Sequence, residues 1–361
     1  MIIFGKNTIL RMNLANRISA FAKLGEILMN PDLESFRSFV SEINQLRELL
    51  VNSQNFNPWF TPDNVKSALW AIGQSLNRNK IEKWINHYKF AKFEKTKRST
   101  VAVVMAGNIP LVGFHDFISV LISGNNILIK LSSDDNKLLP LICKILIKIE
   151  PEFKTRIRFT EGILENFDAI IATGSNNTAR YFEYYFEKYP HIIRKNRNSV
   201  AVINCRETNE QLHLLGTDIF KYFGLGCRNV AKIYVPKNFT VERFYENMQD
   251  FVDVINHSKY KNNYDYNKAI YLVNQTPHFD NGFLILKEDQ GLSSPISVLY
   301  FERYEDFRYI NQTIQNIKDQ IQCVVSADEK IANRVAPGQT QIPQLWEYAD
   351  NIDTIKFLLS I

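Results

Sequence analysis

Features that export, metal binding or membrane insertion would require are scarce in this sequence. Its 361 residues include four cysteines and six histidines, all scattered, so we predict neither a disulfide scaffold nor a metal site. The most apolar stretch, 101–124, is interrupted by Asn108, His115 and Asp116, which argues against a membrane span. The N-terminus lacks the pattern of an export signal. We therefore expect a cytoplasmic protein, in which thiols stay reduced.

The charge balance also excludes a class of partner. Lys and Arg total 43 and Asp and Glu total 38, a net charge of +5, with the two signs interspersed. A nucleic-acid partner requires a clustered basic face, so we expect none. Hydrophobic residues make up 45% and charged residues 22%, which is typical of globular domains. The length predicts two or three of them.

The N-terminal quarter is predicted to be helical, and residues 1–95 form the first region in our division of the chain. Apolar residues recur at helical spacing from Leu14 to Leu28. Thr61-Pro62-Asp63 is a typical helix start, with a hydroxyl N-cap followed by proline. The helical pattern begins at Met12, so we interpret Met12 as the functional start. The role of this region is left open: it could cover the cofactor domain, form an oligomer contact or seat a partner.

Beyond residue 97, short apolar runs alternate with segments of helical length, which predicts an α/β fold with a parallel sheet. We expect a second region at 96–204, a third at 205–336 and a C-terminal segment at 337–361. The polar segment 256–268 is interpreted as a solvated loop. The predicted strands are 101–107, 126–131, 168–174, 199–204, 231–236, 268–273, 297–301 and 322–327.

Cys227 is the strongest candidate for chemistry. It follows Gly224-Leu225-Gly226, between a helical segment and a strand. The two glycines permit a tight turn that lifts the thiol out of the packed interior, and the adjacent Arg228 favours the thiolate. The alternative is that Cys227 is a small buried hydrophobic residue, which is common for a free cysteine.

Three further positions follow strands at the edge where open α/β sheets bind ligands. Asn108, in AGNIP, could donate to a developing oxyanion or stabilise its own turn. Lys130 ends a strand and could reach a ribose or a phosphate, and Gly174-Ser175 opens a helix whose N-terminus attracts phosphate. Each signal is weak by itself: a solvated lysine and an ordinary serine N-cap explain the last two equally well.

Taken in order, these motifs resemble the aldehyde dehydrogenase superfamily, and more closely its LuxC-type acyl-CoA reductase branch. The resemblance extends over residues 55–361 and is clearest in three stretches: NPWFTPDNV (57–65), RKNRNSVAVI with GLGCRNVAKIYVP (194–203 and 224–236), and PGQTQIPQLWEYADNIDTIKFLL (337–359). It implies a Rossmann-like cofactor domain at 96–204 joined to an α/β catalytic domain at 205–336. The chain departs from the family at Leu225, where the motif often reads GQGC, and at Pro337 and Thr340.

The resemblance implies roles for these residues. Cys227 would be the nucleophile that accepts the acyl group, and Asn108 with the Cys227 backbone N–H would form the oxyanion hole. Lys130, Gly174 and Ser175 would bind NADPH. The family relation also leads us to expect a homo-oligomer, and a partner enzyme that supplies the acyl group is an open alternative.

The lack of a glutamate at one position favours some activities of this superfamily over others. Oxidising members carry a glutamate just before the strand at 199–204, whereas this chain has IIRKN at 192–196. Hydrolysis of a thioester intermediate needs a base to activate water. We therefore expect NADPH-dependent reduction of a long-chain fatty acyl-CoA to the aldehyde through acyl-Cys227. This expectation requires an accessible sulfur with no acid beside it. The alternatives are an aldehyde dehydrogenase acting on a smaller substrate and a cofactor-independent acyltransferase.

Overall fold

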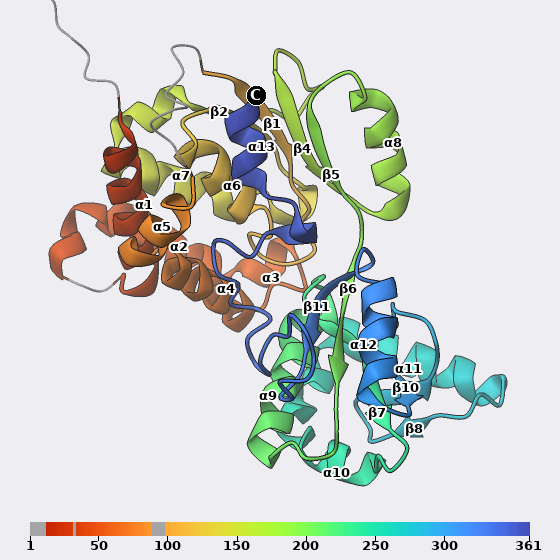
Figure 1. Cartoon of the computed structure of the whole chain (residues 1–361). Coiled ribbons are helices and arrows are strands. Elements are labelled where there is room, and N and C mark those ends of the chain that lie inside the picture. Colours follow the sequence, from red (N-terminus) through yellow and green to blue (C-terminus); the bar gives the residue numbers. More distant parts are fainter. Residues whose placement is uncertain (1–11, 32–33, 89–97) are drawn as a thin grey trace, which may run out of the picture.

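The computed structural model describes residues 12–31, 34–88 and 98–361. Our interpretation of Met12 as the start depends on residues 1–11, which lie outside the described part. Two sheets, the first parallel and the second parallel apart from one edge pair, make up most of the chain together with the helices that cover them (Figure 1). No described helix is both long enough and apolar enough to cross a membrane.

The N-terminal region is helical, as predicted. Thr61 caps α4, with its Oγ1 accepting a hydrogen bond from the Asn64 N–H at 3.2 Å. Helices α1 and α4 cross closely because glycines face the crossing point. A Cβ on Gly25 would lie 2.6 Å from Leu76, and one on Gly73 would lie 2.5 Å from Met29. The helices are α1 (Leu14–Met29), α2 (Val40–Val51), α3 (Ser53–Phe56), α4 (Pro62–Ser75) and α5 (Arg78–Ile85).

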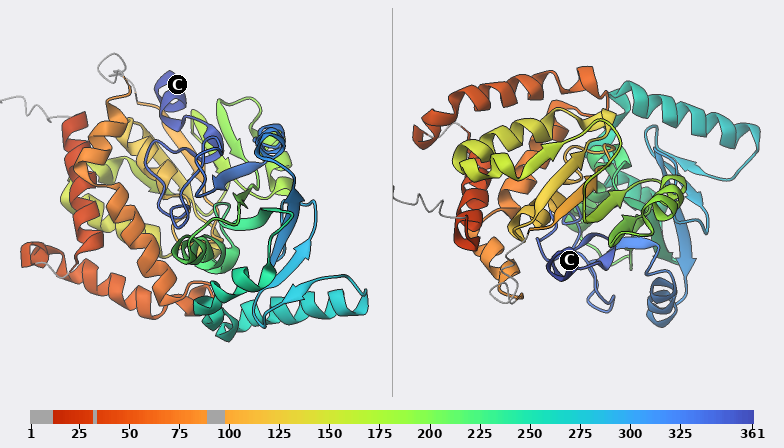
Figure 2. Two further views of the ribbon diagram at one scale, coloured as in Figure 1. Left: turned by 60° about the horizontal axis from the view of Figure 1, so that its bottom comes forward. Right: turned by 90° about the horizontal axis from the view of Figure 1, so that it is seen from above.

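The first sheet is parallel throughout, with strand order β3-β2-β1-β4-β5. Alternate residues of β1 face opposite sides: Val101 and Val103 pack in the core beneath α1, α6 and α7, whereas Ala102 packs on the side of α8. Figure 2 shows the N-terminal helices on the α6 and α7 side. The elements are β1 (Thr100–Val104), α6 (Phe114–Ile122), β2 (Asn126–Lys130), α7 (Leu138–Ile149), β3 (Ile157–Phe159), β4 (Ala169–Thr173), α8 (Asn176–Phe186) and β5 (His191–Arg194).

The second sheet has the order β11-β6-β7-β10-β9-β8, and only the β8–β9 pair is antiparallel. The chain enters this sheet at Asn198, so residues 198–204 belong to the second unit and our predicted boundary at 204 is too late. The elements are β6 (Asn198–Val202), α9 (Asn209–Phe220), β7 (Val230–Pro236), α10 (Val241–Glu246), α11 (Ser258–Val273), β8 (Phe279–Asp280), β9 (Ile285–Glu288), β10 (Val298–Tyr304), α12 (Phe307–Asn316) and β11 (Ile321–Val325).

Two predictions for residues 256–273 are wrong. Both the expected loop at 256–268 and the expected strand at 268–273 lie largely within α11. The buried residues of this helix are Tyr260, Tyr264, Asn267 and Tyr271, spaced by three or four. The apolar run at 268–273 was too short to distinguish strand from helix by itself.

The C-terminal segment returns from the second sheet to the first. Its last helix, α13 (Thr354–Ser360), packs against α6, and Figure 1 shows it beside the first sheet. Tyr348 accepts a hydrogen bond from Trp84 Nε1 at 2.6 Å. The segment therefore bridges the second sheet, the first unit and the N-terminal helices.

Candidate active site

The turn that carries Cys227 is built from consecutive residues in left-handed conformations. Helix α9 ends at Phe220, and Tyr222, Phe223 and Gly224 follow with φ of 53°, 58° and 78°. Such angles are unfavourable for the two aromatic residues and are found mainly where surrounding contacts enforce them. The chain reverses here and enters β7 at Val230.

Asn229 holds this turn together. Its Nδ2 donates to the carbonyls of Asp218 at 3.0 Å and Lys221 at 2.7 Å, and its Oδ1 accepts from the Gly226 N–H at 2.9 Å. Asn229 is almost completely buried. The glycine turn predicted from sequence is therefore present, and a buried asparagine that the sequence reasoning missed maintains it.

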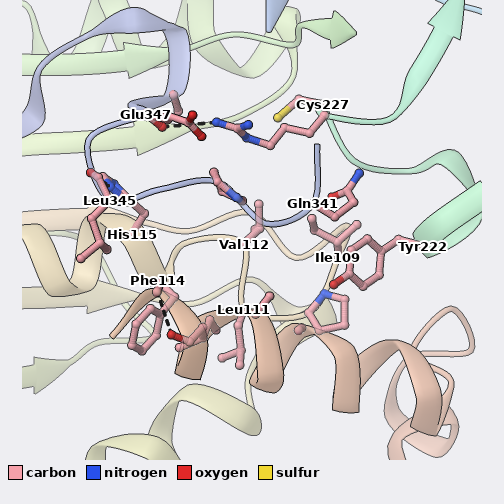
Figure 3. Close-up of a pocket in the computed structure, with 18 of the residues that line it drawn as sticks. Ile109, Leu111, Val112, Phe114, His115, Tyr222, Cys227, Gln341, Leu345 and Glu347 are labelled. Atoms are coloured by element: carbon pink, nitrogen blue, oxygen red, sulfur yellow. Dashed lines mark hydrogen bonds between the residues drawn. The ribbon is translucent and has the colours of Figure 1, made fainter. Parts of the chain in front are cut away.

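Cys227 is partly exposed and lines a cavity of about 210 Å³, which we call the cysteine cavity (Figure 3). Ser199 Oγ donates to the Cys227 carbonyl at 3.0 Å. The Cys227 N–H has no acceptor among the described residues, so this donor is free for a substrate oxygen. Both features fit the predicted nucleophile better than a sealed structural cysteine.

The protonation state differs from our expectation. Burial raises the pKa of Cys227 to about 11, and the opposing charge of Arg228 is too weak to reverse this. The guanidinium of Arg228 is engaged elsewhere: it donates to Cys323 Sγ at 3.3 Å and to the carbonyls of Thr340 and Glu347 at 3.4 and 3.3 Å. Without substrate, Cys227 is therefore a thiol at neutral pH.

Asn108 connects the first sheet to the cysteine turn. Its Nδ2 donates to the Leu225 carbonyl at 2.8 Å, two residues before Cys227. A primary amide carries two hydrogens, so a second one is left for a substrate oxygen. The next part of this loop is fixed by buried Asp135, whose Oδ2 accepts from the Leu111 N–H at 2.7 Å. The structure thus brings Asn108 and the cysteine turn together, as the resemblance implies.

Besides the cysteine turn and Gln322, three segments that are distant in sequence form the walls of the cysteine cavity. Residues 109–118 follow Asn108, α4 contributes a face of small residues, and the C-terminal segment closes the remaining side. The contribution of α4 was missed; its signal was a stripe of small residues at helical spacing, beside the apolar stripe that binds α1. The side chains from α4 and the C-terminal segment are Ala68, Ala71, Ile72, Ser75, Gln341, Pro343, Leu345, Glu347 and Ala349.

Lys130, Gly174 and Ser175 lie at the same edge of the first sheet. Val104 pairs with both Lys130 and Ala172, so the carboxyl ends of β1, β2 and β4 are aligned. Lys130 Nζ donates to the Gly162 carbonyl at 2.8 Å. Ser175 caps α8, and its Oγ accepts from the Thr178 N–H at 3.2 Å. A Cβ on Gly174 would lie 2.9 Å from Thr178 Cβ, so glycine permits this close approach.

A polar cleft of about 940 Å³ begins at Asn176, next to Ser175, and we call it the polar cleft. Residues of both units line it, including Arg180 and Lys195 from the first and Gln290 from the second. A nicotinamide dinucleotide is long, polar and anionic. Such a group fits this cleft together with the α8 N-terminus and Lys130. The sequence alone did not reveal the cleft.

The C-terminal segment brings two carboxylates near Cys227, so our expectation of no acid nearby was too broad. Glu347 lines the cysteine cavity, and its Oε2 accepts from the Gln344 N–H at 2.9 Å. Asp350 lines the polar cleft and forms an ion pair with Arg197 at 2.9 Å; its charge adds to the upward shift of the Cys227 pKa that burial causes. Neither carboxylate forms a hydrogen bond with Cys227.

We compared the fold of this chain with solved structures. Aldehyde dehydrogenase 21 from Physcomitrella patens superposes with a TM-score of 0.66 at 13% identity, covering 97% of this chain and 84% of that one. An NAD-dependent benzaldehyde dehydrogenase from Corynebacterium glutamicum gives 0.62 at 14% identity, covering 90% and 80%. At such low identity these similarities establish the fold alone: the chain has the aldehyde dehydrogenase fold.

Comparisons of sequence establish the family. None of the curated proteins compared with this sequence matches it. A family model described as acyl-CoA reductase (LuxC) matches residues 10–276, which is more than half of the chain and includes Asn108, Lys130, Ser175 and Cys227. The chain therefore belongs to the LuxC family of acyl-CoA reductases.

Proposed function

We propose that this protein reduces a long-chain fatty acyl-CoA to the aldehyde with NADPH, through an acyl-Cys227 intermediate. The observation that carries the proposal is the position of Cys227, on a rigid turn in an apolar cavity next to a polar cleft. Family membership supports the reaction class. The apolar cavity supports a substrate with an aliphatic chain, because such walls stabilise a chain by removing it from water.

The Cys227 thiol releases its proton to solvent, and the resulting thiolate adds to the thioester carbonyl. The carbonyl oxygen becomes an oxyanion, and the free N–H of Cys227 and the second amide hydrogen of Asn108 stabilise it. The carbon–sulfur bond to CoA then breaks, CoA leaves as a thiolate that takes up a proton, and acyl-Cys227 is left.

When bound, the nicotinamide cofactor supplies a hydride to the acyl carbon. We propose that Lys130, Gly174, Ser175 and the polar cleft hold it, with Lys130 favouring the 2′-phosphate of NADPH. The Cys227–carbon bond breaks as the aldehyde forms, and the sulfur returns as a thiolate. Because this cycle needs a reduced thiol, we place the protein in the cytoplasm.

The carboxylates near Cys227 bear on the choice between reduction and hydrolysis. A base that activates water must reach that water with a free oxygen in suitable geometry. Glu347 Oε2 accepts from the Gln344 backbone N–H and Asp350 Oδ1 pairs with Arg197, and neither carboxylate is hydrogen-bonded to Cys227. The second oxygen of each carboxylate has no partner among the described residues, so family membership, rather than these contacts, supports reduction over hydrolysis.

We also propose a homo-oligomer. Tyr181, Tyr184 and Tyr185 project from α8 and are each at least 64% exposed, and α8 packs on the edge strand β5. An apolar patch beside a free strand edge suits a second copy of the chain. Light scattering at micromolar concentration tests whether the protein is a homo-oligomer. A partner enzyme that supplies the acyl group would be recognised by transfer of its acyl group to Cys227.

Mass spectrometry after incubation with palmitoyl-CoA tests the main proposal. We expect the mass to increase by one palmitoyl group located on Cys227, and NADPH to remove it with release of hexadecanal. Acyl transfer to thiols without any dependence on NADPH would indicate an acyltransferase. Oxidation of aldehyde by NADP⁺ without CoA would indicate an aldehyde dehydrogenase.

A further inference from the structure

The side chain of Gln341 lies in the cysteine cavity without a hydrogen-bond partner (Figure 3). Its Nε2 is shielded from solvent and unpaired, and its Oε1 also accepts nothing from the described residues. Buried polar groups are nearly always paired, because they have lost their hydrogen bonds to water. An amide with an unsatisfied donor and acceptor, beside a nucleophilic cysteine, points to a ligand that offers both.

Gln341 is held firmly in this position. The carboxylate of Asp218, fully buried on α9, accepts from the Thr340 N–H and Oγ1–H at 3.1 and 2.7 Å, and from the Gly338 N–H at 2.7 Å. The Thr340 carbonyl accepts from Arg228, the residue after Cys227. The backbone beside Gln341 is therefore fixed relative to Cys227, and the amide side chain starts from a defined position in the cavity wall.

Among the other polar side chains of the cavity, Ser75, His115 and Gln322 have partners within the protein, whereas the described residues provide none for the Tyr222 hydroxyl. Ser75 Oγ donates to the Ile72 carbonyl at 2.7 Å. His115 shares a hydrogen bond of 2.9 Å with the Leu345 carbonyl, so Nε2 carries the proton. Gln322 Oε1 accepts from the Asp350 N–H at 3.1 Å. Gln341 differs from these three side chains because no contact within the protein uses its amide.

We propose that Gln341 binds the first amide of the pantetheine arm of acyl-CoA, the one next to the thioester. This inference rests on the proposed function. The apolar acyl chain offers no hydrogen-bonding group, and the thioester oxygen is directed to Asn108 and the Cys227 N–H. The next polar group in the substrate is a secondary amide whose nitrogen is three atoms beyond the thioester sulfur. That amide supplies one donor and one acceptor, the complement of the Gln341 side chain.

Gln341 is then a specificity residue that distinguishes pantetheine thioesters from other thioesters. The test uses two decanoyl thioesters with leaving groups of similar length. One carries N-acetylcysteamine, which contains the amide, and the other carries pentanethiol, which lacks it. The rate constant for acylation of Cys227 is measured by mass spectrometry in single turnover. The variants are Gln341→Leu and Gln341→Met, and Gln339→Leu is the matched control, because Gln339 lies exposed on the same loop.

We expect the wild-type protein and Gln339→Leu to prefer the N-acetylcysteamine ester by about tenfold, the effect of one or two hydrogen bonds. In both Gln341 variants this preference should fall to near unity, while the rate with the pentanethiol ester stays within about twofold. The preference of the wild-type protein is itself a measurement, so the inference is testable even if a variant does not fold.

Three outcomes would overturn the inference. Equal slowing with both esters would show that Gln341 acts on the carbonyl or on the fold. A change in the preference for hydroxylated over plain acyl chains, with both leaving groups, would show that Gln341 binds the acyl chain. Equal wild-type rates with the two esters would show that the pantetheine amide is not bound. A failed proposed function is recognised separately, because acyl-CoA itself would then leave Cys227 unmodified.

Discussion

The cysteine cavity and the polar cleft meet at the C-terminal segment yet differ in construction. Ala349 lines the cavity, and its neighbour Asp350 lines the cleft. The cavity is mainly apolar and is assembled from α4, residues 109–118 and the segment after Gly338. The cleft is polar and lies where the chain passes from the first sheet to the second. We infer that acyl-CoA, with its acyl chain and the first amide of its pantetheine arm, occupies the cysteine cavity, and that the cofactor occupies the polar cleft.

We expect the largest loss of activity from substitution of Cys227, the residue at which the acyl group and the hydride are proposed to meet. Cys227→Ala removes the only sulfur among the described residues that line the cavity, so we expect complete loss of acylation by palmitoyl-CoA and of aldehyde formation. Mass spectrometry and an aldehyde assay measure the two losses, with Cys205→Ala as the control. Acyl labelling retained in the Cys227 variant would show that another residue is the nucleophile.

The second-largest effect is expected for Asn108→Ala, which should slow acylation in the cysteine cavity without changing cofactor binding in the polar cleft. Loss of an oxyanion donor typically lowers the rate about 10²- to 10³-fold, so we expect slower acylation of Cys227 by about that factor. Affinity for NADPH, measured by titration calorimetry, should stay unchanged. If cofactor affinity fell while acylation stayed normal, Asn108 would belong to the cleft and the oxyanion role would be wrong.

The pH dependence of thiol reactivity tests the burial of Cys227 in the cavity. Because burial raises the pKa to about 11, the thiolate fraction of the free protein should rise about tenfold per pH unit between pH 7 and 10. Alkylation by iodoacetamide, followed at the Cys227 peptide, should rise by the same factor. A rate that is constant above pH 8 would mean that the thiolate already exists in the free protein.

Lys130→Met should lower the affinity for the cofactor and leave acylation of Cys227 unchanged. Loss of one charged hydrogen bond to a ribose or phosphate is expected to weaken NADPH binding about tenfold, with acylation of Cys227 unchanged. Lys137→Met, at an exposed site, is the control. Comparison of NADPH with NADH shows whether Lys130 contacts the 2′-phosphate, since only then is the loss confined to NADPH.

The smallest effect is expected for Glu347→Gln. Its carboxylate forms no hydrogen bond with Cys227, and its Oε2 accepts from the Gln344 backbone N–H, so we expect the lifetime of acyl-Cys227 without NADPH to change by less than about twofold. Mass spectrometry over a time course gives this lifetime. A several-fold longer lifetime in the variant would identify Glu347 as a base for hydrolysis and would favour the oxidising enzyme.

Local patterns predicted the elements of the site but not all of its surroundings. The β-branched runs at 101–107 and 126–131 and the glycines around Cys227 each depend on neighbours in sequence, and the structure has the two strands and the turn they predict. The run at 268–273 misled us, because six residues do not reveal that the tyrosines of α11 share one buried face. The carboxylates of Glu347 and Asp350 were missed since they reach the site from more than one hundred residues away.

Local sequence patterns were enough to predict an α/β fold with a parallel sheet, the strand ends that carry Asn108, Lys130 and Ser175, and the turn at Cys227; the division into two domains came from the family resemblance. Periodicity and turn chemistry are local, so they can be read from the sequence. Three features became visible once the folded chain was known: α4 and the C-terminal segment close the cysteine cavity, burial keeps Cys227 protonated, and Gln341 has no partner among the described residues. Burial and hydrogen-bond pairing depend on which distant segments meet, and no local pattern of residues contains that information.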